Sequence, residues 1–397
     1  MLERKNVTKL TPQEKQNFIA GVQEMKTAGD YDNFVKLHAI ATSSVSAING
    51  GTLNGAHRGP AFLLWHRAFL YEFETTLQKY LSSPMGLPYW DWTTDPTGLT
   101  VFTSDFMGGN GDSKNGFRVS TGPFANPNDD PKKWLTSNFD PQSGTMRIDD
   151  PLLRAFNTSY IPTKSTIISV MITNDFYDDS PFNALGQSGF RSLMEKKLHD
   201  MVHVYVGGHM GNPMVAPNDP VFYLHHVNID RLFLRWQEYQ PTLTYPQKNS
   251  GGPDPFPLGQ NWNDKLLELN EKVSDCWNIN TLGYMYKRSI NLFPNTDLTN
   301  PPYPSKTGPY QSSSEKTFYA QLPQSPSEST NVISGLTSWR LYYTGLDDFH
   351  LKTIEVSLGN TNFPNNIPFT VDLADKSNPL FGAYVKMDLL FFKLLNS

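Results

Sequence analysis

Histidines in the stretch 198–236, LHDMVHVYVGGHMGNPMVAPNDPVFYLHHVNIDRLFLRW, have the spacing of metal ligands. His199 and His203 are four residues apart, so a helix would place them on one face, one turn apart. An Asp-Pro pair then predicts the start of a second helix, which carries His225 and His226. Three imidazoles on two helices can converge on one metal ion if the helices lie side by side.

A second group of three histidines, His38, His57 and His66, lies earlier in the chain. His66 belongs to the strongly helical segment RGPAFLLWHRAFLYEFETTLQKYL, and His38 to a shorter predicted helix. One histidine is usually packed in a core or solvated. Burying six imidazoles without partners would be costly, so a metal site is the better explanation of the two groups.

The ligand type narrows the choice of metal. All-imidazole ligation suits copper, zinc, iron or nickel. The set contains no Glu-x-x-His pair, which argues against a di-iron helical bundle. Cys276 is the only cysteine, so thiolate-rich sites and disulfides within the chain are excluded. Two three-histidine sites with open positions fit a pair of copper ions that share a bound dioxygen, and a zinc-binding protein is the alternative.

The composition excludes several classes of partner. The 397 residues include 18% charged and 13% aromatic residues, with a net charge of -5, which indicates a globular protein without affinity for nucleic acid or an anionic membrane. No apolar run approaches the roughly 18 residues of a membrane span. The charged N-terminus lacks a signal-peptide core, so we expect a cytoplasmic protein, or an exported one if a leader was removed.

Four helices with aromatic inner faces are expected to position the histidines. They are predicted over residues 32–42, 58–81, 190–205 and 219–239. A capping box at Thr11 predicts a further helix before them, and a short one is predicted over 266–276. Residues 95–185, rich in Gly, Pro, Asn, Asp and Ser, are predicted to form long connections with a small hairpin. The predicted fold class is mainly α, with long irregular connections.

The pattern changes after about residue 305. β-Branched and aromatic runs bounded by Pro, Gly, Asn and Asp replace the helical periodicity. These runs are TFYAQL, WRLYYTGL, KTIEVSL, PFTVDL and AYVKMDLLFF. They predict a small β-sandwich-like domain over 305–397, separate from a domain over 1–300.

The histidine motifs resemble those of the type-3 copper proteins, most closely the bacterial tyrosinases, which are polyphenol oxidases. The resemblance runs from RKNVTKLTPQEKQNFIAGVQEMK through HRGPAFLLWHRAFLYEFE and PYWDWTTDP to LGYMYKRS, roughly residues 3–290. It implies a tyrosinase-like four-helix bundle around a dicopper centre within 1–300. The ligands implied for the first copper are His38, His57 and His66, and those for the second are His199, His203 and His226.

The resemblance also implies roles for residues beside the coppers. Family members hold a water, implicated in deprotonating monophenols, between a glutamate and an asparagine. Glu195 matches the glutamate, whereas Asp200 stands in the place of the asparagine. An ionised Asp200 cannot donate an amide hydrogen bond, so this departure bears on the monophenol step. Two adjacent carboxylates would raise one pKa if both are buried.

Four residues are candidates for substrate contact: Val204, Pro213, Met214 and Phe222, the last matching a family phenylalanine that packs against the copper histidines. His225 is expected to pack beside the site rather than bind copper.

Asp230, one turn after His226, is expected to orient nearby histidines or to pair with Arg67 or Arg231.

The activity implied by the resemblance is oxidation of small phenols by O2. A tyrosinase, as in melanin biosynthesis, oxidises o-diphenols to o-quinones and also hydroxylates monophenols. The alternatives are a catechol oxidase without monophenolase activity and a haemocyanin-like oxygen carrier. Latent relatives carry a C-terminal domain that covers the coppers, so the region 305–397 is a candidate lid, with Phe381 as a possible plug.

Overall fold

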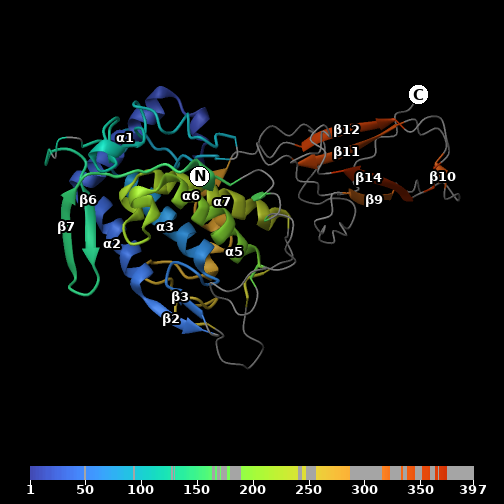
Figure 1. The fold of residues 1–397 in the computed structure, drawn as a ribbon. Helices are drawn as coiled ribbons and strands as arrows, with labels where there is room; N and C mark the ends of the chain where they lie inside the picture. Colours follow the sequence, from blue (N-terminus) through green and yellow to red (C-terminus); the bar gives the residue numbers. More distant parts are fainter. Residues whose placement is uncertain are drawn as a thin grey trace. The chain divides into compact units, whose positions relative to one another are not determined.

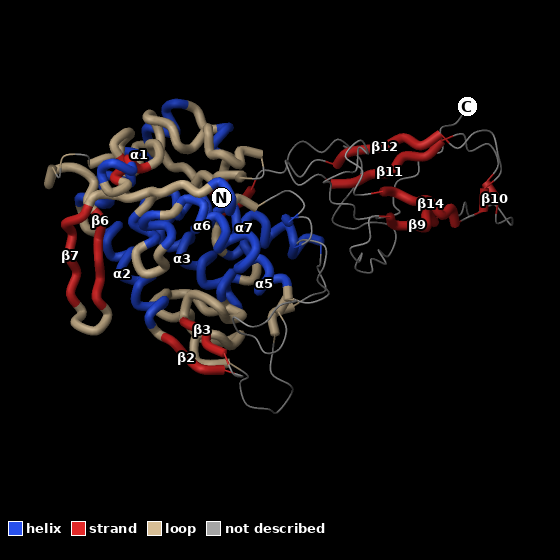
Figure 2. Tube along the Cα trace, viewed as in Figure 1, coloured by secondary structure: helices blue, strands red, loops and turns tan. Residues whose placement is uncertain are grey.

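The computed structural model of the chain describes most of residues 1–286 and short strands beyond residue 314. Within 1–286 the undescribed residues are 49–50, 93, 127, 129, 163–165, 168–169, 171–176, 179–188, 240–243 and 247–255. The chain divides into two compact units. The first is Met1–Thr163 with Asn174–Lys287, and the second is Lys164–Thr173 with Arg288–Ser397. Within the first unit, helices occupy the centre and loops surround them (Figures 1 and 2).

The helices predicted to carry the histidines are present in the first unit. They are α2 (Asp30–Ser43), α3 (Phe62–Leu77), α7 (Val221–Tyr239) and a helical run made of α5 (Phe190–Leu193), a π-helical segment (Met194–His199) and α6 (Asp200–Val206). π-Helical turns within α-helices are frequently found at functional sites, and this one ends on a candidate ligand. The mainly α prediction is therefore confirmed for this unit.

Local signals in the sequence explain where the helices begin. Helix α1 (Pro12–Thr27) starts at the predicted capping box, in which Thr11 and Glu14 exchange side-chain and backbone hydrogen bonds of 2.8 and 3.1 Å. Helix α7 starts after Asp219, whose Oδ1 accepts from the Val221 N–H at 3.1 Å. These caps fix where α1 and α7 begin, and α7 carries His225 and His226.

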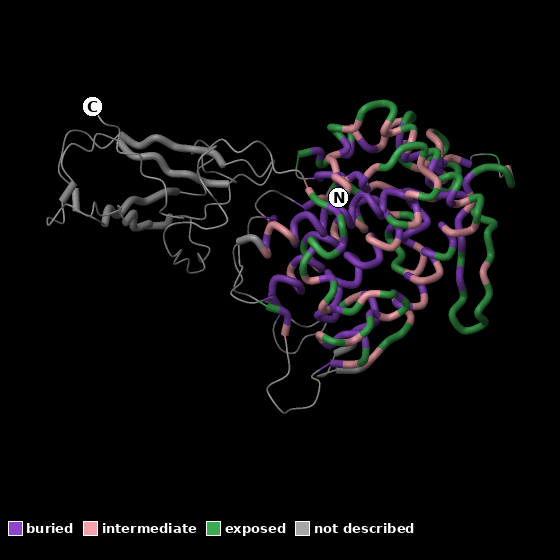
Figure 3. The backbone as a smooth tube through the Cα atoms, turned by 180° about the vertical axis from the view of Figure 1, so that it is seen from behind, coloured by how far each residue is buried: buried purple, intermediate pink, exposed green. Residues whose placement is uncertain are grey.

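The inner faces of the helices form an aromatic core. Trp65, Phe69 and Phe73 of α3 are fully buried, as their spacing predicts. Phe73 stacks on Tyr223 of α7 with ring centroids 3.6 Å apart. The buried residues concentrate on these central helices in Figure 3. The candidate ligands therefore project from rigid, closely packed elements.

The first unit also contains short two-stranded sheets. The predicted hairpin in the long connections is β6 (Thr136–Asp140) with β7 (Thr145–Asp150), and it projects from the helices in Figure 1. The other antiparallel pairs are β2 (Val45–Ile48) with β3 (Gly51–Asn54), and β4 (Gly111–Asp112) with β5 (Arg118–Val119). A parallel pair that the sequence analysis did not predict joins β1 (Leu2–Arg4) to β8 (Tyr284–Tyr286).

The prediction of a helix over 266–276 is wrong. The segment forms turns and one 3₁₀ turn, Ser274–Cys276, and Glu268 has a left-handed φ of 63°. The Leu266 N–H donates to the Glu271 carbonyl, and the Leu267 carbonyl accepts from the Trp65 indole at 2.9 Å. Tertiary contacts thus take the backbone groups that a helix would have paired internally.

The second unit contains antiparallel strand pairs among its described residues. They are β9 (Glu315–Gln321) with β14 (Asn366–Asp372), β11 (Ser338–Thr344) with β12 (Leu351–Ser357), and β10 (Val332–Ile333) with β13 (Phe363–Pro364). Four of the five predicted runs coincide with these strands. The run AYVKMDLLFF and Phe381 lie outside the described residues, and the β-sandwich stays a prediction. Of the helices described, none is both long and apolar enough to cross a membrane.

Candidate metal centre

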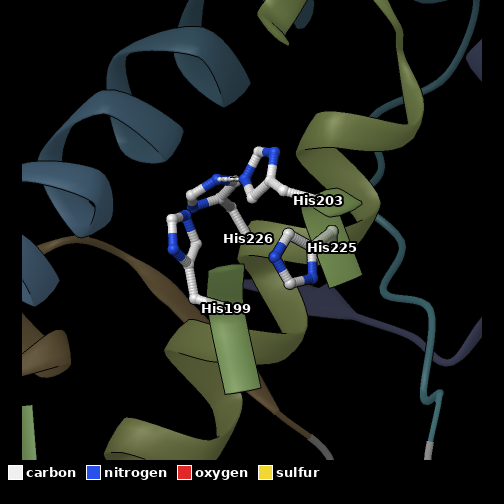
Figure 4. Close-up of side chains that lie close together, drawn as sticks. All are labelled: His199, His203, His225 and His226. Atoms are coloured by element: carbon white, nitrogen blue, oxygen red, sulfur yellow. Dashed lines mark hydrogen bonds between the residues drawn. The ribbon is translucent and has the colours of Figure 1, made fainter. Parts of the chain in front are cut away.

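The predicted ligands gather in two groups. His38 of α2, His57 of the loop before α3 and His66 of α3 present ring nitrogens that all lie within 4.8 Å of one another. The same limit holds for a second group, His199, His203, His225 and His226, which come from the α5–α6 run and from α7 (Figure 4). Each group could hold one metal ion.

The two groups lie against each other. The rings of His66 and His226 stack at a centroid distance of 4.3 Å with an interplanar angle of 11°. His57 and His199 approach to 5.9 Å between centroids. Two ions, one in each group, would therefore be close neighbours, which is the arrangement that a shared small ligand requires.

Burial keeps these imidazoles neutral. Burial lowers the pKa of His66 to about 3, and it holds the pKa values of His38, His57, His199 and His226 well below the ordinary range. A neutral imidazole has a free lone pair on one ring nitrogen, which is the form that binds a metal. The whole set is thus ready to coordinate at neutral pH.

Backbone carbonyls select the tautomer of two rings. The Nδ1–H of His66 donates to the Phe62 carbonyl at 2.9 Å, and that of His203 donates to the Met210 carbonyl at 2.7 Å. The lone pair of each ring is then on Nε2. The Nε2 atoms of His38, His66 and His199 are buried without a hydrogen-bond partner. This is expected of nitrogens that coordinate a metal ion.

The geometry of the second group fits a single ion. The Nε2 atoms of His203 and His226 are 3.1 Å apart and face each other (Figure 4). Two nitrogens at about 2.0 Å from one tetrahedral ion would lie about 3.3 Å apart. The donor set and its spacing therefore suit the copper or zinc expected from the sequence.

His225 differs from its neighbours in the second group. The Trp92 indole N–H donates to its Nδ1 at 3.2 Å, and both side chains are fully buried. The lone pair of Nδ1 is used in that bond, so the neutral ring carries its proton on Nε2. A protonated nitrogen cannot bind a metal. This tautomer favours packing over coordination for His225. Its Nε2 is nevertheless buried without a hydrogen-bond partner, as are those of His38, His66 and His199, so the role of His225 stays a prediction.

Glu195 is held firmly beside the two groups. Its carboxylate accepts from the Arg58 backbone N–H at 2.7 Å and from Arg191 Nη1 at 2.7 Å. Arg191 is in turn held by both oxygens of Asp178, at 2.9 and 3.0 Å. Burial raises the pKa of Glu195 to about 7, although Arg191 opposes the rise. The carboxyl group can therefore gain or lose a proton near neutral pH.

Asp200 contacts a candidate ligand directly. Its Oδ1 accepts from His199 Nδ1 at 2.9 Å, and 54% of the side chain is exposed. Glu195 and Asp200 are therefore not both buried. The negative charge of Asp200 nevertheless contributes to the raised pKa of Glu195. Carboxylate–imidazole pairs of this kind orient metal-binding histidines and increase their basicity.

Three of the four predicted substrate residues lie at or near the surface. Val204, which follows His203 directly, is 42% exposed, Pro213 is exposed and Met214 is half-buried. The Pro213 backbone lies near enough to the His38 ring to oppose the lowering of that histidine's pKa. His203 is itself only partly buried, so these residues are placed where a substrate could approach the second group.

Phe222, the fourth predicted substrate residue, packs against histidines of both groups. It is fully buried, with its ring 4.0 Å from that of His226 and 5.2 Å from that of His38. This packing agrees with what the resemblance implies, and contact of Phe222 with a substrate stays a prediction. Because it contacts histidines of both groups, it packs between the helices that carry them.

Asp230 pairs with cations rather than with a histidine. Its carboxylate binds Arg67 Nε at 2.5 Å and Arg4 Nη1 at 3.1 Å, and accepts from the hydroxyls of Tyr284 and Tyr286. The pairing with Arg67 was one of the predicted options. The predicted orientation of histidines is not seen among its described contacts, because these donors occupy both carboxylate oxygens.

Comparison with known proteins identifies the family. The family model for the common central domain of tyrosinase matches residues 28–239. A tyrosinase of Streptomyces antibioticus is 39% identical over 279 residues, which cover 66% of this chain and 94% of the relative. The chain belongs to the tyrosinase family. The family therefore assigns it to the type-3 copper proteins, as the motifs predicted.

Other members of the tyrosinase family are also similar. Grixazone synthase of Streptomyces griseus is 38% identical over 272 residues, which cover 61% of this chain and 86% of the relative. The solved structure of a polyphenol oxidase mutant from Thermothelomyces thermophila aligns with a TM-score of 0.50 at 18% identity, covering 72% of this chain and 89% of that one. At that identity the likeness concerns the fold alone, which is the tyrosinase fold.

Sequence reasoning missed two residues of this tyrosinase-family centre. Arg191 holds Glu195, and Trp92 holds His225. The four-residue spacing of Arg191 and Glu195 on a predicted helix was a usable signal, because such pairs commonly meet. Trp92 had no such signal, since it is 133 residues from its partner.

Proposed function

We propose that this chain is a dicopper oxidase that uses O2 to oxidise o-diphenols to o-quinones. The observation that carries the proposal is the pair of facing groups of neutral, mostly buried imidazoles, in which the Nε2 atoms of His38, His66 and His199 have no hydrogen-bond partner. Membership of the tyrosinase family and relatives named tyrosinase support copper as the metal and small phenols as substrates. The proposed ligands are His38, His57 and His66 for one copper and His199, His203 and His226 for the other.

The residues of the chain prepare the site for this chemistry. Bound copper would supply O2 binding and the electron transfers of diphenol oxidation. The chain fixes the ring tautomers through the carbonyls of Phe62 and Met210 and packs Phe222 against histidines of both groups. Val204 and Met214 flank the proposed approach of the substrate.

Monophenol hydroxylation is the second part of the proposal. A phenol must lose its proton before it can bind a metal as a phenolate, and a carboxylate with a pKa near 7 suits that step. Glu195 is such a group, and Arg191 together with the Arg58 N–H holds it in place. We assign the proton-accepting role to Glu195, with Asp200 as the neighbour that supplies a further negative charge.

Metal removal and reloading test the main proposal. We expect two coppers per chain and quinone formation from L-DOPA, with both lost after chelation and restored by Cu(II) but not by Zn(II). Two bound coppers and reversible O2 uptake without quinone would instead indicate an oxygen carrier. Zinc in chains produced with copper available would contradict the copper assignment. Turnover of L-DOPA but not of tyramine would indicate a catechol oxidase.

Glu195→Gln tests the monophenol step. We expect oxidation of tyramine to fall by about 10²-fold, the lower range for loss of a general base, while oxidation of L-DOPA changes little. Because the carboxylate is the active form, tyramine oxidation by the parent should rise with pH as Glu195 loses its proton near pH 7. The rise should be absent in Glu195→Gln. An equal loss for both substrates would contradict the assignment.

A further inference from the structure

Residues 153–157, which we call the brace, connect two of the candidate ligand helices. The backbone of the brace binds the end of α6, the helix of His203, and the turn that follows it. The side chain of Arg154 binds the start of α7, the helix of His226. The brace lies outside both histidine groups, and no role follows for it from the proposed ligand set.

One edge of the brace closes the end of α6. The Ala155 N–H donates to the Val206 carbonyl at 3.0 Å, and the Asn157 N–H donates to the Tyr205 carbonyl at 2.8 Å. The last carbonyls of a helix have no partner within the helix itself. The brace supplies those partners, which fixes the position of the last turn of α6.

The same edge fixes the turn that orients His203. The Leu153 N–H donates to His209 Nδ1 at 3.0 Å, and the His209 N–H donates to the Leu153 carbonyl at 3.1 Å. His209 belongs to the 3₁₀ turn Gly208–Gly211. In that turn the Met210 carbonyl accepts from His203 Nδ1 at 2.7 Å. The position of the brace is thus transmitted to a ligand ring through one turn of backbone.

The side chain of Arg154 reaches the start of α7. Its Nε and Nη2 donate to the two oxygens of Asp219 at 2.7 and 2.8 Å, and both side chains are fully buried. Such a bidentate pair fixes orientation as well as distance. Asp219 in turn caps α7 through the Val221 N–H. The helix that carries His226 is therefore held from the same five residues.

We propose that the brace is a positioning element that sets the relative placement of His203 and His226 for one copper. The inference rests on the proposed function, because it concerns the second of the two copper sites. The two Nε2 atoms are 3.1 Å apart although they come from different helices. The brace is bonded to both helix ends, so it can hold that separation before the ion arrives.

Glycines make the close approach of the turn to the brace possible. Gly208 has a φ of +54°, and a Cβ added there would lie 2.1 Å from the Leu153 carbonyl oxygen. Gly211, in the same turn, would meet nothing within 4 Å. Gly144, in the distant β6–β7 hairpin, has a φ of +70° and open space around it. Alanine at Gly208 would therefore both strain the backbone and displace the brace, whereas alanine at Gly144 would only strain the backbone. Alanine at Gly211 would do neither.

The test measures Cu(II) affinity at each site separately, in the full-length chain. In a His66→Ala background, where the second group is intact, competition with a chelator should show about 10–100-fold weaker binding for Gly208→Ala. Gly211→Ala and Gly144→Ala should bind as the background does. In a His226→Ala background, which retains the first group, Gly208→Ala should have no effect.

A milder pair of variants provides a second measurement. His209→Ala removes the acceptor of the Leu153 N–H and should also weaken Cu(II) at the second group, with an altered EPR spectrum of the single bound ion. His209→Asn keeps an acceptor and should restore both. Equal affinities in Gly208→Ala and Gly211→Ala, or an equal loss in Gly144→Ala, would overturn the proposal. A parent chain that binds Zn(II) but not Cu(II) would refute the proposed function, whereas the glycine comparison made with Zn(II) would still decide on the brace.

Discussion

Replacing His226 with asparagine should leave the chain with one tightly bound copper instead of two and without measurable oxidation of L-DOPA. His226 belongs to the second group, and its ring stacks on His66 of the first. Without it, His199 and His203 are the proposed ligands that remain for that ion, and an amide is a poor substitute for imidazole at copper. Copper per chain after dialysis and the initial rate of quinone formation measure the two effects.

The adjacent residue provides the control. His225→Asn replaces a ring of the same size at the same depth, and its amide oxygen can still accept from the Trp92 indole. We expect this variant to keep two coppers and most of the diphenol oxidation. Loss of copper from His225→Asn with retention in His226→Asn would reverse the assignment of the ligand between these neighbours.

The parts of the site that could be predicted are those encoded by short spacings. His199 and His203 share a helix face because they are four residues apart, and the cap at Thr11 lies three residues from its partner Glu14. The hydrogen bond from the Arg58 N–H to Glu195 spans 137 residues. No periodicity in the sequence predicts such a contact, because it depends on how the loops pack against the helices in the folded chain.

The incorrect prediction of a helix over 266–276 shows that a short spacing can also mislead. Leu266, Leu269 and Val273 recur at three- and four-residue steps and are all buried, as on a helix face. The segment nevertheless forms turns, since the Trp65 indole and the Glu72 carboxylate bind its backbone. The apolar spacing of these residues therefore reflects burial in the tertiary structure, and local helicity does not explain it. Tertiary contacts override propensity most readily in short segments such as this one.

Asp230→Asn should be the most destabilising single change among the ion pairs of the first unit described above. Asp230 is buried and faces Arg67 and Arg4, while Tyr284 and Tyr286 donate to the same carboxylate. Removing its charge leaves buried guanidinium groups without full compensation, which costs about 3–5 kcal/mol. Urea unfolding of the copper-free chain, followed by tryptophan fluorescence, measures the loss through the shift in midpoint.

An exposed aspartate provides the matched comparison. Asp149 lies 4.0 Å from Arg147 in the β6–β7 hairpin, with 52% of its side chain exposed, so Asp149→Asn should cost less than about 1 kcal/mol. Because Asp230 has no described contact with a histidine, folded Asp230→Asn should keep two coppers and diphenol oxidation per copper. Equal midpoints in the two variants would show that the buried ion cluster contributes no more than a surface pair. Loss of copper from folded Asp230→Asn would instead restore the predicted role of Asp230 in orienting the histidines.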